Sequence, residues 1–130
     1  MATTPAFTST PRYAVASIST ANTNRDGTGT IVSVATGVAA GTKVFEVVVQ
    51  ATATTTAGMV RLYVSTDSGT TWKLFDEVSI AAATPSASVK AQRVSTTYAN
   101  LILPSSSTVL GAAPHNAEAF NVIALAGDLT

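Results

Sequence analysis

Short runs in which apolar and polar residues alternate dominate this chain, and this period of two restricts its fold more than any other feature. In residues 43–52, the odd-numbered positions from Phe45 to Ala51 are apolar, whereas the even-numbered positions are mostly polar. Successive side chains of a β-strand point to opposite faces, so one face of this segment is expected in a core and the other partly in water. No segment shows a sustained helical period.

Clusters of Gly, Pro, Asn, Asp and Ser separate the alternating runs at the spacing typical of an all-β sandwich or barrel. The expected strands, about eight in number, are residues 13–19, 29–36, 43–52, 59–65, 72–80, 88–98, 101–103 with 109–110, and 119–125. Pro85, Pro104 and Pro114 are expected at breaks between them. We predict an all-β fold, an antiparallel two-sheet β-sandwich of jelly-roll-like form.

Composition limits the chemistry that this fold can carry. The 130 residues include seven Lys or Arg, seven Asp or Glu, one His and no Cys, and the formal net charge is zero. Without cysteine there is no disulfide or thiolate metal site, and without net charge there is no field that attracts nucleic-acid phosphates or acidic lipid. We expect no enzyme activity, cofactor or metal, and neither nucleic acid nor membrane as a partner. Weak charge repulsion between copies favours self-association.

Residues 1–12 are expected to form an extended N-terminal arm outside a single domain of residues 13–130. Pro5 and Pro11 each remove a backbone N–H and bias the preceding residue toward extended conformations. Phe7 would let such an arm lie across a neighbouring subunit, and a frayed terminus accounts for the same residues equally well. The arm lacks the basic start and long apolar stretch of a signal peptide, so no targeting segment is expected.

Residues 65–72 read Ser-Thr-Asp-Ser-Gly-Thr-Thr-Trp. The specified positions, Ser65, Asp67, Gly69, Thr71 and Trp72, resemble the Asp-box motif. An Asp side chain accepts hydrogen bonds from backbone donors of its own turn and Gly supplies a positive φ, so the segment predicts a stabilised hairpin with the indole packed under the turn. In families that carry the Asp-box, sialidases included, it is a fold element away from catalysis, which implies a structural role here. Sugar stacking on an exposed Trp72 is the alternative.

Other residues with chemical potential have structural interpretations. His115 is of the residue type most used as a general base, but we expect a turn histidine bonded to Asn116 or to backbone. Residues 22–27 are rich in Asn and Asp but lack the distal glutamate of a calcium loop, which favours turn chemistry. Asp76 and Glu77 are adjacent on a predicted strand and should face opposite ways, which excludes a simple pair of catalytic carboxylates.

Three segments together resemble small structural proteins of tailed bacteriophages. They are Asn-Arg-Asp-Gly-Thr-Gly-Thr-Ile-Val at 24–32, Thr-Thr-Thr-Ala-Gly-Met-Val-Arg-Leu at 54–62 and His-Asn-Ala-Glu-Ala-Phe-Asn-Val at 115–122. The resemblance implies a β-sandwich that decorates or cements the head, or a tail, connector or fibre-associated protein. Its implied partners are other copies, as a homotrimer or other cyclic oligomer, and the major capsid protein or other virion proteins. Its implied location is the virion, most simply the capsid surface, after synthesis in the host cytoplasm.

A carbohydrate-binding module is the alternative from another class. Trp72, Tyr63 and Tyr98 would then offer stacking faces for sugar rings. Aromatic residues make up only 6% of the chain, whereas such a face needs several exposed together. A hydrolase would need carboxylates that the fold brings together from separate strands.

Overall fold

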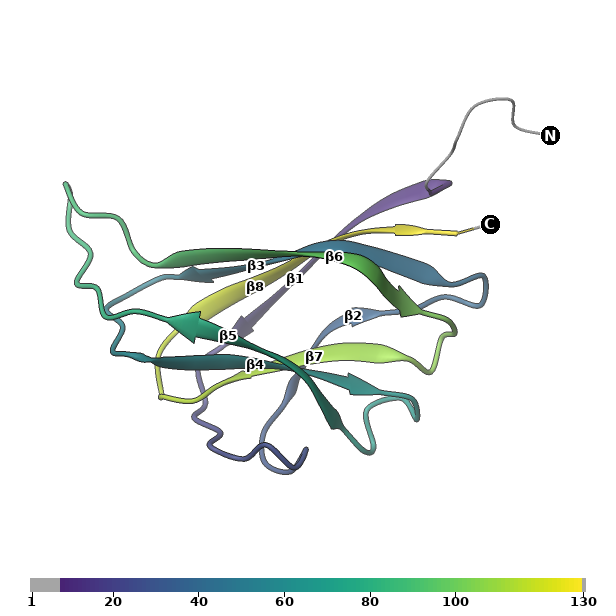
Figure 1. The fold of residues 1–130 in the computed structure, drawn as a ribbon, viewed down its shortest axis with the longest axis horizontal. Helices are drawn as coiled ribbons and strands as arrows, with labels where there is room; N and C mark the ends of the chain where they lie inside the picture. The colour runs from purple at the N-terminus through teal and green to yellow at the C-terminus, as the bar shows by residue number, and fades with distance from the viewer. Residues whose placement is uncertain (1–7, 130) are drawn as a thin grey trace.

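The computed structural model describes residues 8–129, and these residues form eight β-strands without a helix. The strands are β1 (Thr10–Ile18), β2 (Val32–Thr36), β3 (Thr42–Ala51), β4 (Gly58–Ser65), β5 (Lys73–Ile80), β6 (Arg93–Leu103), β7 (Val109–Pro114) and β8 (Phe120–Asp128). They lie in two stacked layers (Figure 1). The all-β prediction is confirmed.

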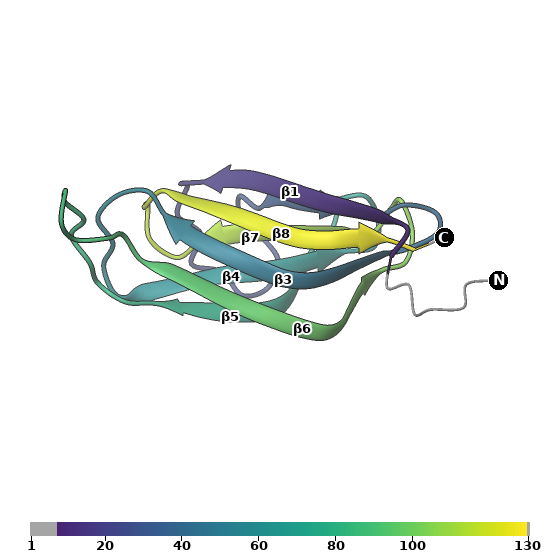
Figure 2. The same ribbon diagram turned by 90° about the horizontal axis from the view of Figure 1, so that it is seen from above.

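The two sheets have four strands each, in the orders β1-β8-β3-β6 and β2-β7-β4-β5 (Figures 1 and 2). Every strand pair is antiparallel. Only β4 and β5 are both consecutive in the chain and paired, and the other connections cross between the sheets. This order is that of a jelly roll, which confirms the predicted two-sheet sandwich.

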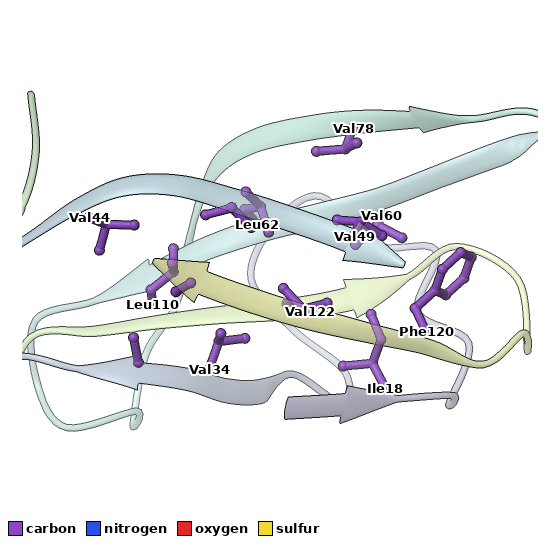
Figure 3. Packing of buried hydrophobic residues seen from close by; sticks show 14 of the residues in the cluster. Ile18, Val34, Val44, Val49, Val60, Leu62, Val78, Leu110, Phe120 and Val122 are labelled. Carbon is purple, nitrogen blue, oxygen red and sulfur yellow. The ribbon is translucent and has the colours of Figure 1, made fainter. Parts of the chain in front are cut away.

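The core lies between the two sheets and consists mostly of aliphatic side chains (Figure 3). Its members include Ile18, Val34, Val44, Val49, Val60, Leu62, Val78, Leu110, Phe120 and Val122. β-Branched residues pack well on a pleated surface, which is why a Val-rich chain with a period of two forms these layers.

A β-bulge interrupts the alternation predicted for β3. The register against both β6 and β8 shifts between Val44 and Glu46. Val44 and Val47 therefore both enter the core, whereas Phe45 is only partly buried and stays outside it. The ring of Phe45 instead lies 5.7 Å from the Nζ atom of Lys43. The prediction that odd-numbered residues face the core was correct from Val47 onward and wrong for Phe45. An extra residue in a strand moves the side chains that precede it to the opposite face of the sheet.

The predicted boundary between an arm and the domain, after residue 12, does not coincide with the start of the sheet. β1 begins at Thr10, and Pro11 lies within it opposite Gly127 of β8. Because β1 is the edge of its sheet, proline is tolerated there. The assignment of Pro11 to an arm was therefore wrong, while Pro5 and Phe7 lie outside the described residues.

Other strand boundaries also differ from the prediction. Residues 86–89 form a turn in which the Ser86 hydroxyl accepts from the backbone N–H of Ser88, so β6 begins only at Arg93. β6 then continues through residues 101–103, which had been assigned to a separate strand with residues 109–110. Pro114 ends β7 rather than lying in a break between strands.

Candidate functional site

The 65–72 turn connects β4 to β5 and is held by side-chain hydrogen bonds. The backbone N–H of Thr71 donates to Oδ1 of Asp67 at 2.8 Å, and the Thr71 hydroxyl donates to Oδ2 at 2.6 Å. Ser65 Oγ donates to Asp67 at 2.7 Å and accepts from the N–H of Gly69 at 2.8 Å. These bonds, led by that from the Thr71 hydroxyl, lower the pKa of Asp67 from 3.8 to about 2. The carboxylate is thus a structural acceptor, as predicted.

Trp72 packs beneath this turn, also as predicted. Gly69 has a φ of 89°, and a Cβ built on it would lie 3.4 Å from Cζ2 of the indole. On its other side the ring lies against Gly111 of β7 and near Ile31. The backbone of Gly27 approaches the Trp72 carbonyl so closely that no side chain fits there. Trp72 is therefore a half-buried packing residue that joins the turn to the sheet.

The connection of residues 19–31 covers the outer face of the sheet β2-β7-β4-β5. In Figure 1 it lies beneath this sheet. Arg61 on β4 donates from Nη1 to the Asn22 carbonyl at 3.0 Å, and the Tyr63 hydroxyl donates to the Asn24 carbonyl at 2.7 Å. Both β4 side chains are fully buried although they point away from the core between the sheets. Alternation along residues 59–65 puts Arg61 on the face opposite Val60 and Leu62, but nothing in this pattern indicates the cover.

Within the 19–31 connection, the residues predicted to form turns do so. Oδ1 of Asp26 accepts from the backbone N–H of Thr28 at 3.1 Å and from its hydroxyl at 2.6 Å. Asn22 accepts from the N–H of Asn24 at 3.0 Å through its own Oδ1. Gly27 has a φ of 87°, a conformation that favours glycine. The side chains that a calcium loop would direct at an ion are thus engaged with their own backbone.

Arg61 is the most deeply buried charge among the described residues, with 1% of its surface exposed. Its nearest carboxylate is Glu77, whose Oε2 lies 3.6 Å from Nε, too far for a hydrogen bond. Glu77 is also bound by Arg25, through contacts of 2.7 and 3.2 Å, and the hydrogen bond from Arg25 lowers the pKa of Glu77. Arg25 therefore fastens the connection to β5, while Glu77 is the counter-ion shared with Arg61.

His115 contributes to the same cluster through its ring. Its Nδ1 lies 3.1 Å from Nη2 of Arg61. Because a guanidinium only donates, Nδ1 accepts, and the ring proton lies on Nε2. The backbone N–H of His115 donates to the Met59 carbonyl at 2.8 Å, so of the two predicted alternatives, Asn116 or backbone, a backbone partner is present. Asn116 instead donates to Thr56.

The carboxylates of β5 point to opposite faces, as predicted. Asp76 accepts from the Tyr98 hydroxyl of β6 at 2.7 Å, whereas Glu77 faces the 19–31 connection. Burial, followed by the bond to Asp76, raises the pKa of Tyr98. Each carboxylate thus has a separate structural partner, and the two do not form a joint site.

The three aromatic residues considered for sugar stacking do not share an exposed surface. Tyr63 is 0% exposed, and Trp72 is half-buried under its turn. Tyr98 is also half-buried, with its ring centroid 5.4 Å from that of Phe75. A sugar ring needs an open aromatic face, so this set of residues does not supply one.

Among residues 8–129, no connection like 19–31 covers the β1 and β8 strands on the outer face of the other sheet, β1-β8-β3-β6. Tyr13 and Val15 of β1 are 69% and 52% exposed. Leu125 and Ile123 of β8 lie directly opposite them and are partly exposed. These four residues, Tyr13, Val15, Ile123 and Leu125, form what we call the β1–β8 face. Alternation in residues 13–19 puts Tyr13 and Val15 on one face of the strand, but it does not indicate whether that face is the outer one.

Metal-binding clusters and membrane-spanning helices are two other features that the described residues could contain. Residues 8–129 contain no group of three or more His, Cys, Asp or Glu side chains that could hold a metal ion. Across the same part of the chain, no helix has the length and apolar character needed to cross a membrane.

A comparison with protein-family models, curated proteins and solved structures finds no match for this chain.

Proposed function

We propose that this chain is a non-enzymatic structural protein of a tailed-phage virion, and specifically a capsid decoration protein that binds the outer head surface and stabilises contacts between capsomers. The observation that carries the proposal is that the outer faces of the two sheets differ in how far they are covered. One is covered by the 19–31 connection, and the other presents the uncharged β1–β8 face. Contiguous exposed apolar residues are typical of protein interaction surfaces.

The chain's charge supports the same role. With seven basic and seven acidic residues it has a formal net charge of zero, so many copies can lie close together without strong repulsion. The charged side chains near the 19–31 connection are engaged in holding the fold, as with Arg25 on Glu77 and Arg61 on Asn22. The three segments that resemble tailed-phage structural proteins support a location in the virion.

Cryo-electron microscopy of particles that carry this protein tests the proposal. Copies at threefold or quasi-threefold positions on the head are expected. Rings at the neck or tail would contradict decoration and favour a tail, connector or fibre-associated protein. Absence of the chain from purified particles would contradict a virion role altogether.

Rebinding to heads that lack the protein tests which surface makes the contact. Leu125→Lys places a charge on the β1–β8 face and should reduce co-sedimentation with heads. Thr66→Lys is the matched control, because Thr66 is exposed at an unspecified position of the 65–72 turn. Equal loss of binding in both variants, or in neither, would contradict the assignment of the shell contact to this face.

A further inference from the structure

Four strands lie at sheet edges, and three of them carry features that discourage pairing with another chain. β2 has five residues and a register shift against β7. β5 has a register shift against β4 and contains Lys73, Asp76 and Glu77. β6 has a register shift in its pairing with β3 and begins with Arg93. Short length, bulges and charged side chains are the usual protections of an edge strand.

β1 is different from these three edges. It has nine residues and pairs with β8 without any register shift. Figure 2 shows it at the edge of its sheet, beside β8. Its one charged residue, Arg12, is engaged with Asp128 at 3.1 Å and with the Thr36 carbonyl at 2.8 Å. Its outward side chains, from Tyr13 through Val15 to Ser17, are exposed and uncharged. Pro11 protects only the N-terminal end of β1, and beyond it this regular edge with uncharged outward side chains is a template for another strand.

We infer that β1 pairs antiparallel with β1 of a second copy of this chain. When two copies of a strand are related by a twofold axis, each presents the same surface to the other, so the contact is self-complementary. The outward side chains of β1 are uncharged and the protein has no net charge, so electrostatic repulsion does not oppose the approach of the two copies. The two four-stranded sheets would then join into one continuous sheet across the axis. A charged partner strand would find no opposite charge on these outward side chains.

The position of the axis follows from Pro11. Proline has no N–H to give to a ladder, so regular pairing is confined to the rest of β1, residues 12–18, whose middle residue is Val15. Centring the axis there places Val15 opposite its own copy, and Tyr13 opposite Ser17 of the second copy. The two Tyr13 rings and the two Val15 side chains then lie on one face of the joined sheet. Such an isologous contact closes as a dimer.

This inference does not depend on whether the protein is part of a virion, since it concerns self-association of the free protein in solution. The mass of the full chain in solution, measured by light scattering across a range of concentrations, should approach twice 13.1 kDa. Val15→Lys puts two like charges together at the axis and should raise the dimer Kd about 100-fold or more. Val89→Lys is the matched control, because Val89 is a similarly exposed valine, at 50%, on the β5–β6 connection. It should leave the mass unchanged.

A cysteine substitution tests the register directly. The chain has no cysteine, so Val15→Cys introduces one thiol per copy. Directly opposite residues of an antiparallel pair have Cα atoms about 4.5–5.5 Å apart, within the range that a disulfide spans. Mild oxidation should therefore crosslink Val15→Cys rapidly. Ile102→Cys, on the β6 edge and 46% exposed, should crosslink far more slowly.

The outcomes are decisive in either direction. A dimer that Val15→Lys dissociates and Val15→Cys locks supports the pairing. A monomer at all concentrations overturns it. So does a trimer or any other oligomer that keeps its mass in Val15→Lys, or a Val15→Cys variant that crosslinks no faster than Ile102→Cys.

Discussion

The indole of Trp72 rests on Gly111, across the outer face of the sheet β2-β7-β4-β5. A Cβ added to Gly111 would lie 2.7 Å from Cζ3 of the indole and 2.8 Å from Cγ2 of Ile31. The 65–72 turn can therefore be seated on β7 only because residue 111 has no side chain. Through Ile31, this contact links the 65–72 turn to the 19–31 connection, which covers the outer face of the same sheet.

Gly111→Ala is expected to destabilise the protein by about 1–3 kcal/mol, the usual cost of overpacking a filled space. Thermal unfolding followed by circular dichroism measures the effect. Trp72→Phe shortens the side chain by removing the bicyclic indole while keeping an aromatic ring. Gly111→Ala should therefore cost less in a Trp72→Phe background, and equal costs in the two backgrounds would show that the indole is not the obstacle.

Asp67 should make stability depend on pH in the acid range. Its pKa is lowered to about 2 in the folded protein from an ordinary 3.8, so the unfolded chain binds the proton more readily. The stabilisation is complete above the ordinary value and is lost as pH falls toward about 2. Asp67→Asn should lower Tm at neutral pH, and its difference from the native protein should shrink with acidification. Melting curves whose separation is independent of pH would contradict this role.

The origin of the Asp67 shift can be tested at one bond. The Thr71 hydroxyl is the first cause of the lowered pKa of Asp67. Thr71→Val removes that donor but keeps the shape of the side chain and the backbone N–H. NMR titration of the Asp67 carboxyl should show its pKa move toward the ordinary range, whereas Thr66→Val, at an unspecified position of the turn, should leave it in place.

Alternation and turn chemistry were enough to predict the all-β class, the two-sheet form and, in the 65–72 turn, the role of Asp67 as an acceptor and the positive φ of Gly69. These features depend on neighbours in the sequence, whose geometry is local. The bulge at Phe45 could not be predicted, because the pattern of β3 alone is regular and the shift arises in its pairing with β6 and β8. The contact between Trp72 and Gly111 could likewise not be predicted from the sequence, since it joins two segments far apart in the chain.

Buried polar residues show the same limit. Arg61 in an alternating strand is expected to face solvent, as a charged residue usually does. The 19–31 connection buries it, and its bond to the Asn22 carbonyl depends on a loop path that no pattern in β4 specifies.

Tyr98 should resist ionisation in alkali. Burial first, and then the bond to Asp76, raise its pKa, and burial also raises the pKa of Tyr63. Tyrosinate absorbance should therefore show two of the chain's three tyrosines ionising late, and Tyr98→Phe should remove one late step. Since the folded pKa lies above the unfolded value of about 10, this stabilisation is present below that value and is lost as pH rises through the folded pKa. Uniform ionisation in the folded protein would contradict the bond.

Glu77 is expected to matter more for the buried Arg61 than for the exposed Arg25. Glu77→Gln leaves a guanidinium that is 1% exposed without its nearest carboxylate, and an uncompensated buried charge is unfavourable. Tm should fall by several degrees. Arg25→Gln breaks only the more exposed pair, and surface ion pairs contribute little, so its effect should be small.

A double-mutant cycle then separates the two roles of Glu77. In an Arg61→Met background the buried charge is gone, so Glu77→Gln should lower Tm only as much as Arg25→Gln does. If Glu77→Gln lowers Tm equally with and without Arg61, the carboxylate stabilises the fold through Arg25 alone. In that case Arg61 is held by the Asn22 carbonyl and by Nδ1 of His115, at 3.0 and 3.1 Å, without a functional counter-ion.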